Sequence, residues 1–188
     1  MRIIETGRLI LRPITENDVE AIFEYSQSEN VGPNAGWKPH ANIEETHEIM
    51  KLIFLDKENV WGMVLKETGK LFGSIGLIPD PKRENDGTRM LGYAIGEYYW
   101  GRGYTTEAVR ALINYGFYEL ELDLISAYCY PFNEKSKRVL KKCGFEYEGK
   151  LHLAEKRYDG EILDNECYAI KKPMSAENGG ICTLVRER

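Results

Sequence analysis

The chain has 188 residues, a net charge of −5 and a hydrophobic fraction of 43%, which fits one globular domain with a sizeable core. The acidic balance argues against a general nucleic-acid or anionic-membrane surface. The four cysteines show no CxxC spacing and only three histidines occur, so we expect no metal site. The first residues lack an apolar signal segment and no window approaches a membrane span, which predicts a cytoplasmic protein with reduced cysteines.

Hydrophobic periodicity predicts strands and helices in alternating groups along the chain. Thr15 with Asp18, and Asn42 with Glu45, have the spacing of helix caps. Residues 30–42 and 79–87 are rich in Gly, Pro, Asn or charged residues and predict loops. The expected strands cover residues 3–12, 60–66, 71–78, 90–95, 124–130, 145–158 and 162–171, and the expected helices cover 15–27, 47–55, 108–117 and 133–144.

The order of these elements predicts an α/β fold with a single mixed, largely antiparallel central sheet of about seven strands and about four flanking helices. A doubly wound parallel sheet is excluded because three strands follow one another without a helix between them. We expect one domain over residues 1–172. Residues 173–188 are polar and contain glycine, which predicts a C-terminal tail.

One short stretch, YYWGRGYTTEA (residues 98–108), places two glycines between a strand and a helix. Gly101 and Gly103 would let a phosphate approach the free N–H groups at the helix start, and Arg102 adds positive charge. Thr105 and Thr106 have hydroxyls for the same purpose. A tight turn without a ligand explains the two glycines equally well. The spacing matches neither a P-loop nor a dinucleotide motif, so another pyrophosphate is favoured.

A second segment, YPFNEKSKRVLKKCGFEYEG (residues 130–149), favours a ligand at the glycine turn over a purely structural turn. Taken together, the two segments resemble the GNAT superfamily of acetyl-CoA-dependent N-acetyltransferases. The opening 7–23, the form WGRGYTTEA and the late 158–170 are similar to its ribosomal-protein N-terminal (alanine) acetyltransferase branch. The resemblance spans about residues 3–172. The matched motif positions are Tyr98, Gly101, Gly103, Asn133, Ser136, Gly144 and Phe145.

The resemblance implies how acetyl-CoA would be held. Its pantetheine arm would pair with the strand at Ala94 and Ile95 and would hydrogen-bond to Asn133. The basic residues after Asn133 would add positive charge near the nucleotide, although at least two of the three are expected to be a solvated helix face. These three are Lys135, Lys137 and Arg138. The pyrophosphate would lie on the N–H groups of Trp100, Gly101, Arg102, Gly103, Tyr104, Thr105 and Thr106.

The implied reaction is direct attack of a primary amine on the thioester, with a strand N–H near Ile95 stabilising the carbonyl oxygen. Family members often carry a tyrosine proton donor where this chain has Leu140. Ser136, one helical turn earlier, is the expected substitute and is our catalytic candidate. A small residue tolerated in a helix is the alternative for Ser136.

The acceptor is expected to be a protein N-terminus or a small-molecule amine, bound near Trp37 and His40 in the loop 30–42. The general base is left open, since Glu97 is expected to face solvent and Glu107 to balance the helix dipole. A water-mediated base is also compatible. Nucleophilic cysteine catalysis is excluded because Cys129 falls in an expected strand and Cys143 at a helix end. We expect both to be buried apolar residues, and no nearby histidine supports activation.

Two other functions remain open at this point. The chain could be a catalytically weak CoA-binding sensor or interaction module on the same fold, or it could bind the phosphate of another nucleotide. We expect no nucleic-acid or membrane partner, and a monomer or a homodimer.

Overall fold

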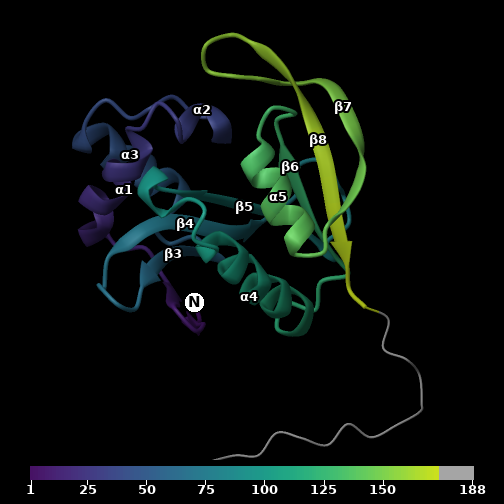
Figure 1. Cartoon of the computed structure of the whole chain (residues 1–188), viewed down its shortest axis with the longest axis horizontal. Helices are drawn as coiled ribbons and strands as arrows, with labels where there is room; N and C mark the ends of the chain where they lie inside the picture. Colours follow the sequence, from purple (N-terminus) through teal and green to yellow (C-terminus); the bar gives the residue numbers. More distant parts are fainter. Residues whose placement is uncertain (174–188) are drawn as a thin grey trace, which may run out of the picture.

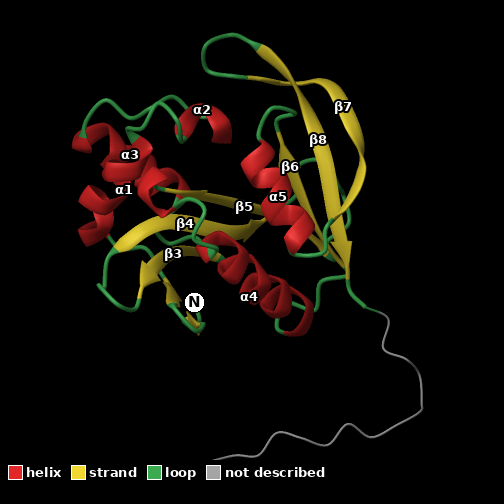
Figure 2. Ribbon diagram, in the orientation of Figure 1, coloured by secondary structure: helices red, strands yellow, loops and turns green. Residues whose placement is uncertain are grey.

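The computed structural model describes residues 1–173, in which one mixed sheet is flanked by helices (Figures 1 and 2). The strands are β1 (Ile4–Glu5), β2 (Leu9–Arg12), β3 (Val60–Leu65), β4 (Leu71–Ile78), β5 (Thr88–Ile95), β6 (Leu124–Cys129), β7 (Glu146–Lys156) and β8 (Ile162–Lys171). The helices are α1 (Val19–Ser26), α2 (Gly32–Ala35), α3 (Ile43–Ile53), α4 (Tyr104–Tyr118) and α5 (Glu134–Lys142), with short 3-10 turns η1 (Glu16–Asp18) and η2 (Glu97–Tyr99).

The sheet runs in the order β1-β2-β3-β4-β5-β6-β8-β7. Every neighbouring pair is antiparallel except β5 and β6, which are parallel. The chain between these two strands contains α4, as a parallel connection requires. The sheet is therefore mixed and largely antiparallel, as the order of elements predicts.

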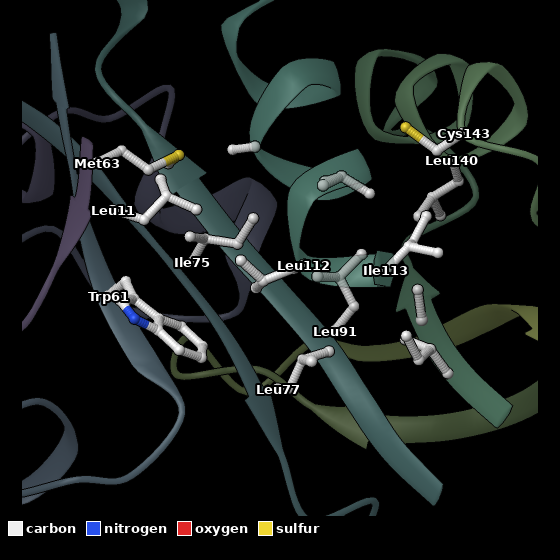
Figure 3. Close-up of a cluster of buried hydrophobic side chains, with 14 of the residues drawn as sticks. Leu11, Trp61, Met63, Ile75, Leu77, Leu91, Leu112, Ile113, Leu140 and Cys143 are labelled. Atoms are coloured by element: carbon white, nitrogen blue, oxygen red, sulfur yellow. The ribbon is translucent and has the colours of Figure 1, made fainter. Parts of the chain in front are cut away.

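Two hydrophobic clusters cover the two faces of the sheet. Successive strand residues point to opposite faces, and on β5 Ile95 belongs to the larger cluster while Ala94 belongs to the smaller one. The larger cluster packs α4 and α5 against the sheet; Figure 3 shows Leu112 and Ile113 from α4 close to Leu91 on β5. The smaller cluster packs α1 and α3 against the other face.

The structure has one strand and one α-helix more than predicted within its described residues. The expected first strand splits into β1 and β2 because Thr6 and Leu9 close a tight turn: the Thr6 N–H donates to the Leu9 carbonyl (2.9 Å) and the Leu9 N–H to Thr6 Oγ1 (3.0 Å). The extra helix, α2, lies in the predicted loop 30–42. It has Pro33 in its first turn and ends at Gly36, whose φ is +93°.

Both predicted helix caps are present. The Glu45 N–H donates to Asn42 Oδ1 (2.8 Å) at the start of α3, and the Thr15 N–H donates to Asp18 Oδ2 (2.8 Å) ahead of α1. The tail predicted for residues 173–188 lies outside the described residues, apart from its first residue.

Candidate active site

The glycine turn between β5 and α4 has a backbone that favours glycine. Gly101 has φ +74° and Gly103 has φ +79°, the left-handed region in which side chains are strained. Space does not limit either position: a methyl group at Gly101 would meet no atom within 4 Å, and one at Gly103 would meet only Arg8 Nη2 at 3.5 Å. The turn thus needs glycine for its own shape and also leaves its outer surface open.

This turn exposes a run of free hydrogen-bond donors. From Gly101 to Thr106, six consecutive backbone N–H groups donate to no acceptor among residues 1–173, and the first helical bond of α4 joins the Glu107 N–H to the Gly103 carbonyl (3.1 Å). The resemblance also includes Trp100 in this run, but the Trp100 N–H donates to the Glu97 carbonyl (3.0 Å). The free donors therefore begin one residue later, and they coincide with the positive end of the α4 dipole.

Glu107 braces the turn and is not free for proton transfer. Its carboxylate accepts from the Thr6 hydroxyl (2.6 Å) and from the Arg8 backbone and guanidinium (2.8 and 2.6 Å). Burial raises the pKa of Glu107, but these hydrogen bonds outweigh burial and lower it overall. Arg8 also donates to the Arg102 carbonyl (3.0 Å) and lies over the Tyr104 ring. The β1–β2 turn thus fixes the start of α4.

Two cations stand beside the free donors. The Arg102 guanidinium lies over the Tyr98 ring, 4.3 Å from its centre, and the Lys135 ammonium from α5 lies 3.4 Å from the centre of the Trp100 ring. Lys137, by contrast, pairs with Glu134 (2.5 Å). The positive charge available at the turn is therefore carried by Arg102 and Lys135.

The strands β5 and β6 form a fork. They pair only at their first residues, from Thr88 opposite Leu124 to Met90 opposite Ser126. Beyond that point β5 follows β4 as far as Ile95, and β6 follows β8 as far as Cys129. Alternate N–H and C=O groups of the unpaired part of β5 therefore face the fork without a strand partner. Ala94 and Ile95 bury their side chains in the core, so only their backbones can contact a ligand here.

The start of α5 brings two further candidates to this fork. Asn133 Oδ1 caps α5 by accepting from the Ser136 N–H (3.1 Å), while its Nδ2 donates to the Asn34 carbonyl (3.1 Å). The Ser136 hydroxyl lies 2.8 Å from the Tyr93 hydroxyl on β5. Burial raises the pKa of Tyr93, so its phenol stays neutral. Leu140, one turn beyond Ser136, is buried in the core.

His40 and Trp37, the two residues expected near the acceptor amine, have different surroundings in the loop between α1 and α3. His40 is buried, and its Nδ1 lies 2.9 Å from the Thr46 hydroxyl. Because the Thr46 hydroxyl donates to the Asn42 carbonyl (3.0 Å), His40 Nδ1 is the donor in this pair. Burial lowers the pKa of His40. His40 therefore anchors the loop, whereas Trp37 is half-buried and its Nε1 has no partner among the described residues.

Glu97 is exposed, as the sequence predicts, but its carboxylate is not free. Its carboxylate accepts from the hydroxyl of Ser28 and from Nδ2 of Asn30 (2.9 Å), both just after α1. These two bonds engage both carboxylate oxygens, so Glu97 is a link between two loops and a poor candidate for the base.

A carboxylate that the sequence did not single out lies on the acceptor side. Glu155 on β7 accepts from the Tyr130 hydroxyl (2.6 Å) and from Asn165 Nδ2 (3.3 Å). A methyl group at Gly36 would lie 2.9 Å from Glu155 Oε1, which places the end of α2 against this pair. Burial, followed by the Glu155 hydrogen bond, raises the pKa of Tyr130. Tyr130 therefore stays a donor to Glu155.

Other chemistries find little support among residues 1–173. No cluster of three or more His, Cys, Asp or Glu side chains there could hold a metal ion, and the expectation of a metal-free protein stays a prediction. Cys129 and Cys143 are buried, as expected, and burial raises the pKa of Cys129 to about 12, so its thiol is not activated. In this part of the chain no helix has the length and apolar character to cross a membrane.

Comparison with known proteins settles the family. The model of the acetyltransferase (GNAT) domain matches residues 8–146, which is more than half of the chain. The chain belongs to the GNAT acetyltransferase family. This acetyltransferase is 33% identical over 175 residues to the uncharacterized N-acetyltransferase YoaA of Bacillus subtilis (strain 168), an alignment that covers 91% of this chain and 97% of YoaA.

Solved structures share the fold of this GNAT acetyltransferase. A GNAT-family acetyltransferase from Bacillus anthracis matches it with a TM-score of 0.80 at 28% identity, over 90% of this chain and 98% of that one. The ribosomal-protein-S5-alanine acetyltransferase from Vibrio fischeri matches with a TM-score of 0.74 at 23% identity, over 93% and 98%. The predicted family, fold class and acetyl-CoA-dependent N-acetyltransferase activity are therefore confirmed.

Proposed function

We propose that this GNAT acetyltransferase holds acetyl-CoA with its pyrophosphate on the N–H groups of Gly101 to Thr106 and its pantetheine arm in the β5/β6 fork, and transfers the acetyl group to a primary amine. The observation that carries the proposal is the run of six free N–H donors at the start of α4. Such donors bind anions because the helix dipole and the orphan N–H groups act together. Arg102 and Lys135, which lie over the rings of Tyr98 and Trp100, add positive charge near these donors.

The fork suits an extended ligand. The backbone groups of β5 that face it have the spacing of a strand, so an amide-containing chain can add to this edge as a strand does. Asn133 lies at the opposite side of the fork and can offer its side-chain amide. Acetyl-CoA supplies a thioester, whose carbonyl carbon is open to attack by an amine.

Ser136 is the proposed donor to the leaving sulfur. The Tyr93 hydroxyl is 2.8 Å from Ser136 Oγ, and because the Tyr93 phenol keeps its proton it can donate to the serine oxygen. Ser136 then turns its own proton toward the fork. Ser136 and Tyr93 together thus replace the tyrosine donor that family members often carry at the position of Leu140.

Glu155 is the proposed base, acting directly or through a water. An acceptor amine is protonated at neutral pH and must lose a proton before it attacks. Glu155 is half-buried, it is oriented by Tyr130 and Asn165, and it faces the end of α2 on the acceptor side. Trp37 is the proposed apolar contact for the acceptor, and His40 is proposed to support the loop that carries Trp37.

A binding measurement followed by a turnover screen tests the proposal. Acetyl-CoA should raise the melting temperature of the full chain, and ATP or NAD should not, because only acetyl-CoA carries the pantetheine arm. Thiol release should then be followed with acetyl-CoA and a panel of amines: peptides beginning with alanine or serine, a polyamine, an amino sugar and amino acids. The proposal predicts release that depends on one class of amine.

The alternatives give different results. A CoA-binding sensor would be stabilised by acetyl-CoA but would release no thiol with any amine. Stabilisation by ATP or NAD equal to that by acetyl-CoA would point to another nucleotide binder and overturn the placement in the fork. The panel also chooses between a protein N-terminus and a small amine as acceptor.

A further inference from the structure

The segment 28–36, which joins α1 to the end of α2, contacts both sides of the β5/β6 fork. Figure 1 shows α2 on the same side as α1 and α3, facing the start of α5. The contacts are polar and involve named side chains at both ends of the segment. The residues that hold this segment directly follow β5 on one side and β6 on the other, so we name residues 28–36 the strap.

On the β5 side the strap is held by Glu97. This residue follows the last residue of β5, Ile95, by two positions and precedes the first free donor, Gly101, by four. Its two carboxylate oxygens accept from Ser28 and Asn30 at the beginning of the strap. Hydrogen bonds to a charged acceptor are stronger than those between neutral groups. One side chain therefore joins the strap to the segment that leads into the glycine turn.

On the β6 side the strap meets residues just past the end of that strand. The Asn34 carbonyl accepts from Asn133 Nδ2 (3.1 Å), and Gly36 lies against the Tyr130 hydroxyl and Glu155. A methyl group at Gly36 would lie 3.1 Å from the Tyr130 oxygen and 2.9 Å from Glu155 Oε1, which leaves no room for a side chain. The far end of the strap is thus packed on the proposed base.

We propose that the strap closes the acceptor side of the fork and that Glu97 is a positioning residue for it. This inference rests on the proposed function for its kinetic consequences. With the strap held, the acceptor enters beside Trp37 and Glu155, and water is kept from the thioester. Without the Glu97 bonds, the strap keeps its β6-side contacts and its buried Val31 but loses its link to the β5 side, so acceptor binding weakens and water reaches the acetyl group. The lost acetyl group then leaves as acetate, with water supplying the oxygen and a proton going to the thiolate.

The test compares Glu97→Ala with Glu29→Ala. Glu29 is exposed, lies between Ser28 and Asn30, and makes no ion pair or hydrogen bond among the described residues, so its removal changes charge in the strap without changing an anchor. Glu97→Gln is the intermediate variant because it keeps one acceptor oxygen. Amide hydrogen exchange of residues 28–36, acetyl-CoA affinity, acceptor KM and thiol release without acceptor are measured on the full chain.

The expected result is specific to Glu97. Its alanine variant should exchange faster in residues 28–36, raise the acceptor KM by roughly threefold to tenfold, and increase thiol release without acceptor, because two exposed charge-assisted hydrogen bonds are lost. Acetyl-CoA affinity should stay near that of the wild type. Glu97→Gln should give values between those of Glu97→Ala and the wild type, and Glu29→Ala should match the wild type.

Two results would overturn the inference. Unchanged exchange in Glu97→Ala would show that the bonds do not hold the strap. A loss of acetyl-CoA affinity as large as the rise in acceptor KM would show that Glu97 serves the cofactor turn and not the acceptor side. Hydrogen exchange can be measured without an acceptor amine. If the wild type transfers no acetyl group to any amine, the proposed reaction is rejected, but the exchange data still show whether Glu97 holds the strap.

Discussion

At the scale of single residues, tyrosine hydroxyls orient both groups that we place in catalysis. Tyr93 on β5 contacts Ser136, and Tyr130 after β6 contacts Glu155. Burial raises the pKa of both phenols, so both remain neutral donors over the pH range in which an enzyme works. Neither tyrosine can be the base. The base role therefore falls to Glu155, and the acid role is the one we place on Ser136, to which Tyr93 can donate.

The Tyr93–Ser136 contact predicts a coupled loss of activity. Ser136→Ala should lower kcat by roughly tenfold to a hundredfold, toward the lower range of general acid catalysis, because the thiolate then leaves without a donor. Tyr93→Phe should lower kcat less, since Ser136 keeps its hydroxyl. The double variant should be no slower than Ser136→Ala, because Tyr93 acts through the serine. Steady-state kinetics at saturating acetyl-CoA measure all three.

Tyr115→Phe is the matched control for the loss of a phenol hydroxyl. Tyr115 lies on α4, where its ring packs edge-on against Trp61 at 5.2 Å. This variant should keep the wild-type kcat. Additive losses in the Tyr93→Phe, Ser136→Ala double variant would show that the two hydroxyls act separately.

At the scale of elements, local patterns predict the glycine turn but not the fork beside it. The strand, the two glycines and the helix after them occur in the expected order, and Gly144, where the sequence predicts the end of the last helix, lies just after α5 with φ +88°. The fork depends on which neighbours β5 and β6 follow after Met90 and Ser126. Such long-range pairing is not recorded in the periodicity of either strand. The strap and the position of Glu155 could not be predicted from the sequence for the same reason.

The glycine turn can now be tested with a substitution that tolerates its backbone. Valine at position 103 would be strained at φ +79°, so a loss of stability could not be separated from a loss of acetyl-CoA affinity. Asparagine adopts left-handed conformations more readily. If the ligand contacts the backbone here, Gly103→Asn should weaken acetyl-CoA binding by roughly tenfold or more, equal to about one strong hydrogen bond, while the protein stays folded.

Gly69→Asn supplies the control for the cost of a side chain at positive φ. Gly69 has φ +69° in the β3–β4 turn, and a methyl group there would meet nothing within 4 Å. Both variants should lose similar stability in thermal unfolding, but only Gly103→Asn should lose affinity in calorimetric titration with acetyl-CoA. Wild-type affinity in Gly103→Asn would mean that the glycine serves the turn alone.

At the scale of the whole molecule, the sequence predicts the layers well and the acceptor side poorly. Alternation and caps identify all the long elements because each depends on neighbours within one or two turns. The acceptor side instead contains Gly36 after α2, Tyr130 after β6 and Glu155 on β7. The pairing of β7 with β8 shifts in register twice, the second time between Leu151 and Glu155. A register shift decides which way a strand residue points, and no local pattern gives it. The division of residues 1–172 and 173–188 stays a prediction.

Global stability should depend on pH through His40, the buried histidine that anchors the strap's loop. His40 is neutral in the fold because burial lowers its pKa below the ordinary 6.5, and this outweighs the opposite effect of Glu45. As the pH falls, the unfolded chain therefore takes up the proton first. The stability associated with neutral His40 is complete above about pH 6.5 and is lost as the pH falls from there toward the lowered folded value, by about 1.4 kcal/mol for each unit between the two pKa values.

His40→Asn keeps an N–H donor for Thr46 but does not titrate. Its melting temperature should start lower because of the smaller side chain, and should fall less than that of the wild type between pH 7.5 and pH 5. His152→Asn, which changes an exposed histidine beside Asp164, should keep the steep wild-type dependence. Parallel melting curves for His40→Asn and the wild type across this range would show that His40 is not the group that limits stability in acid.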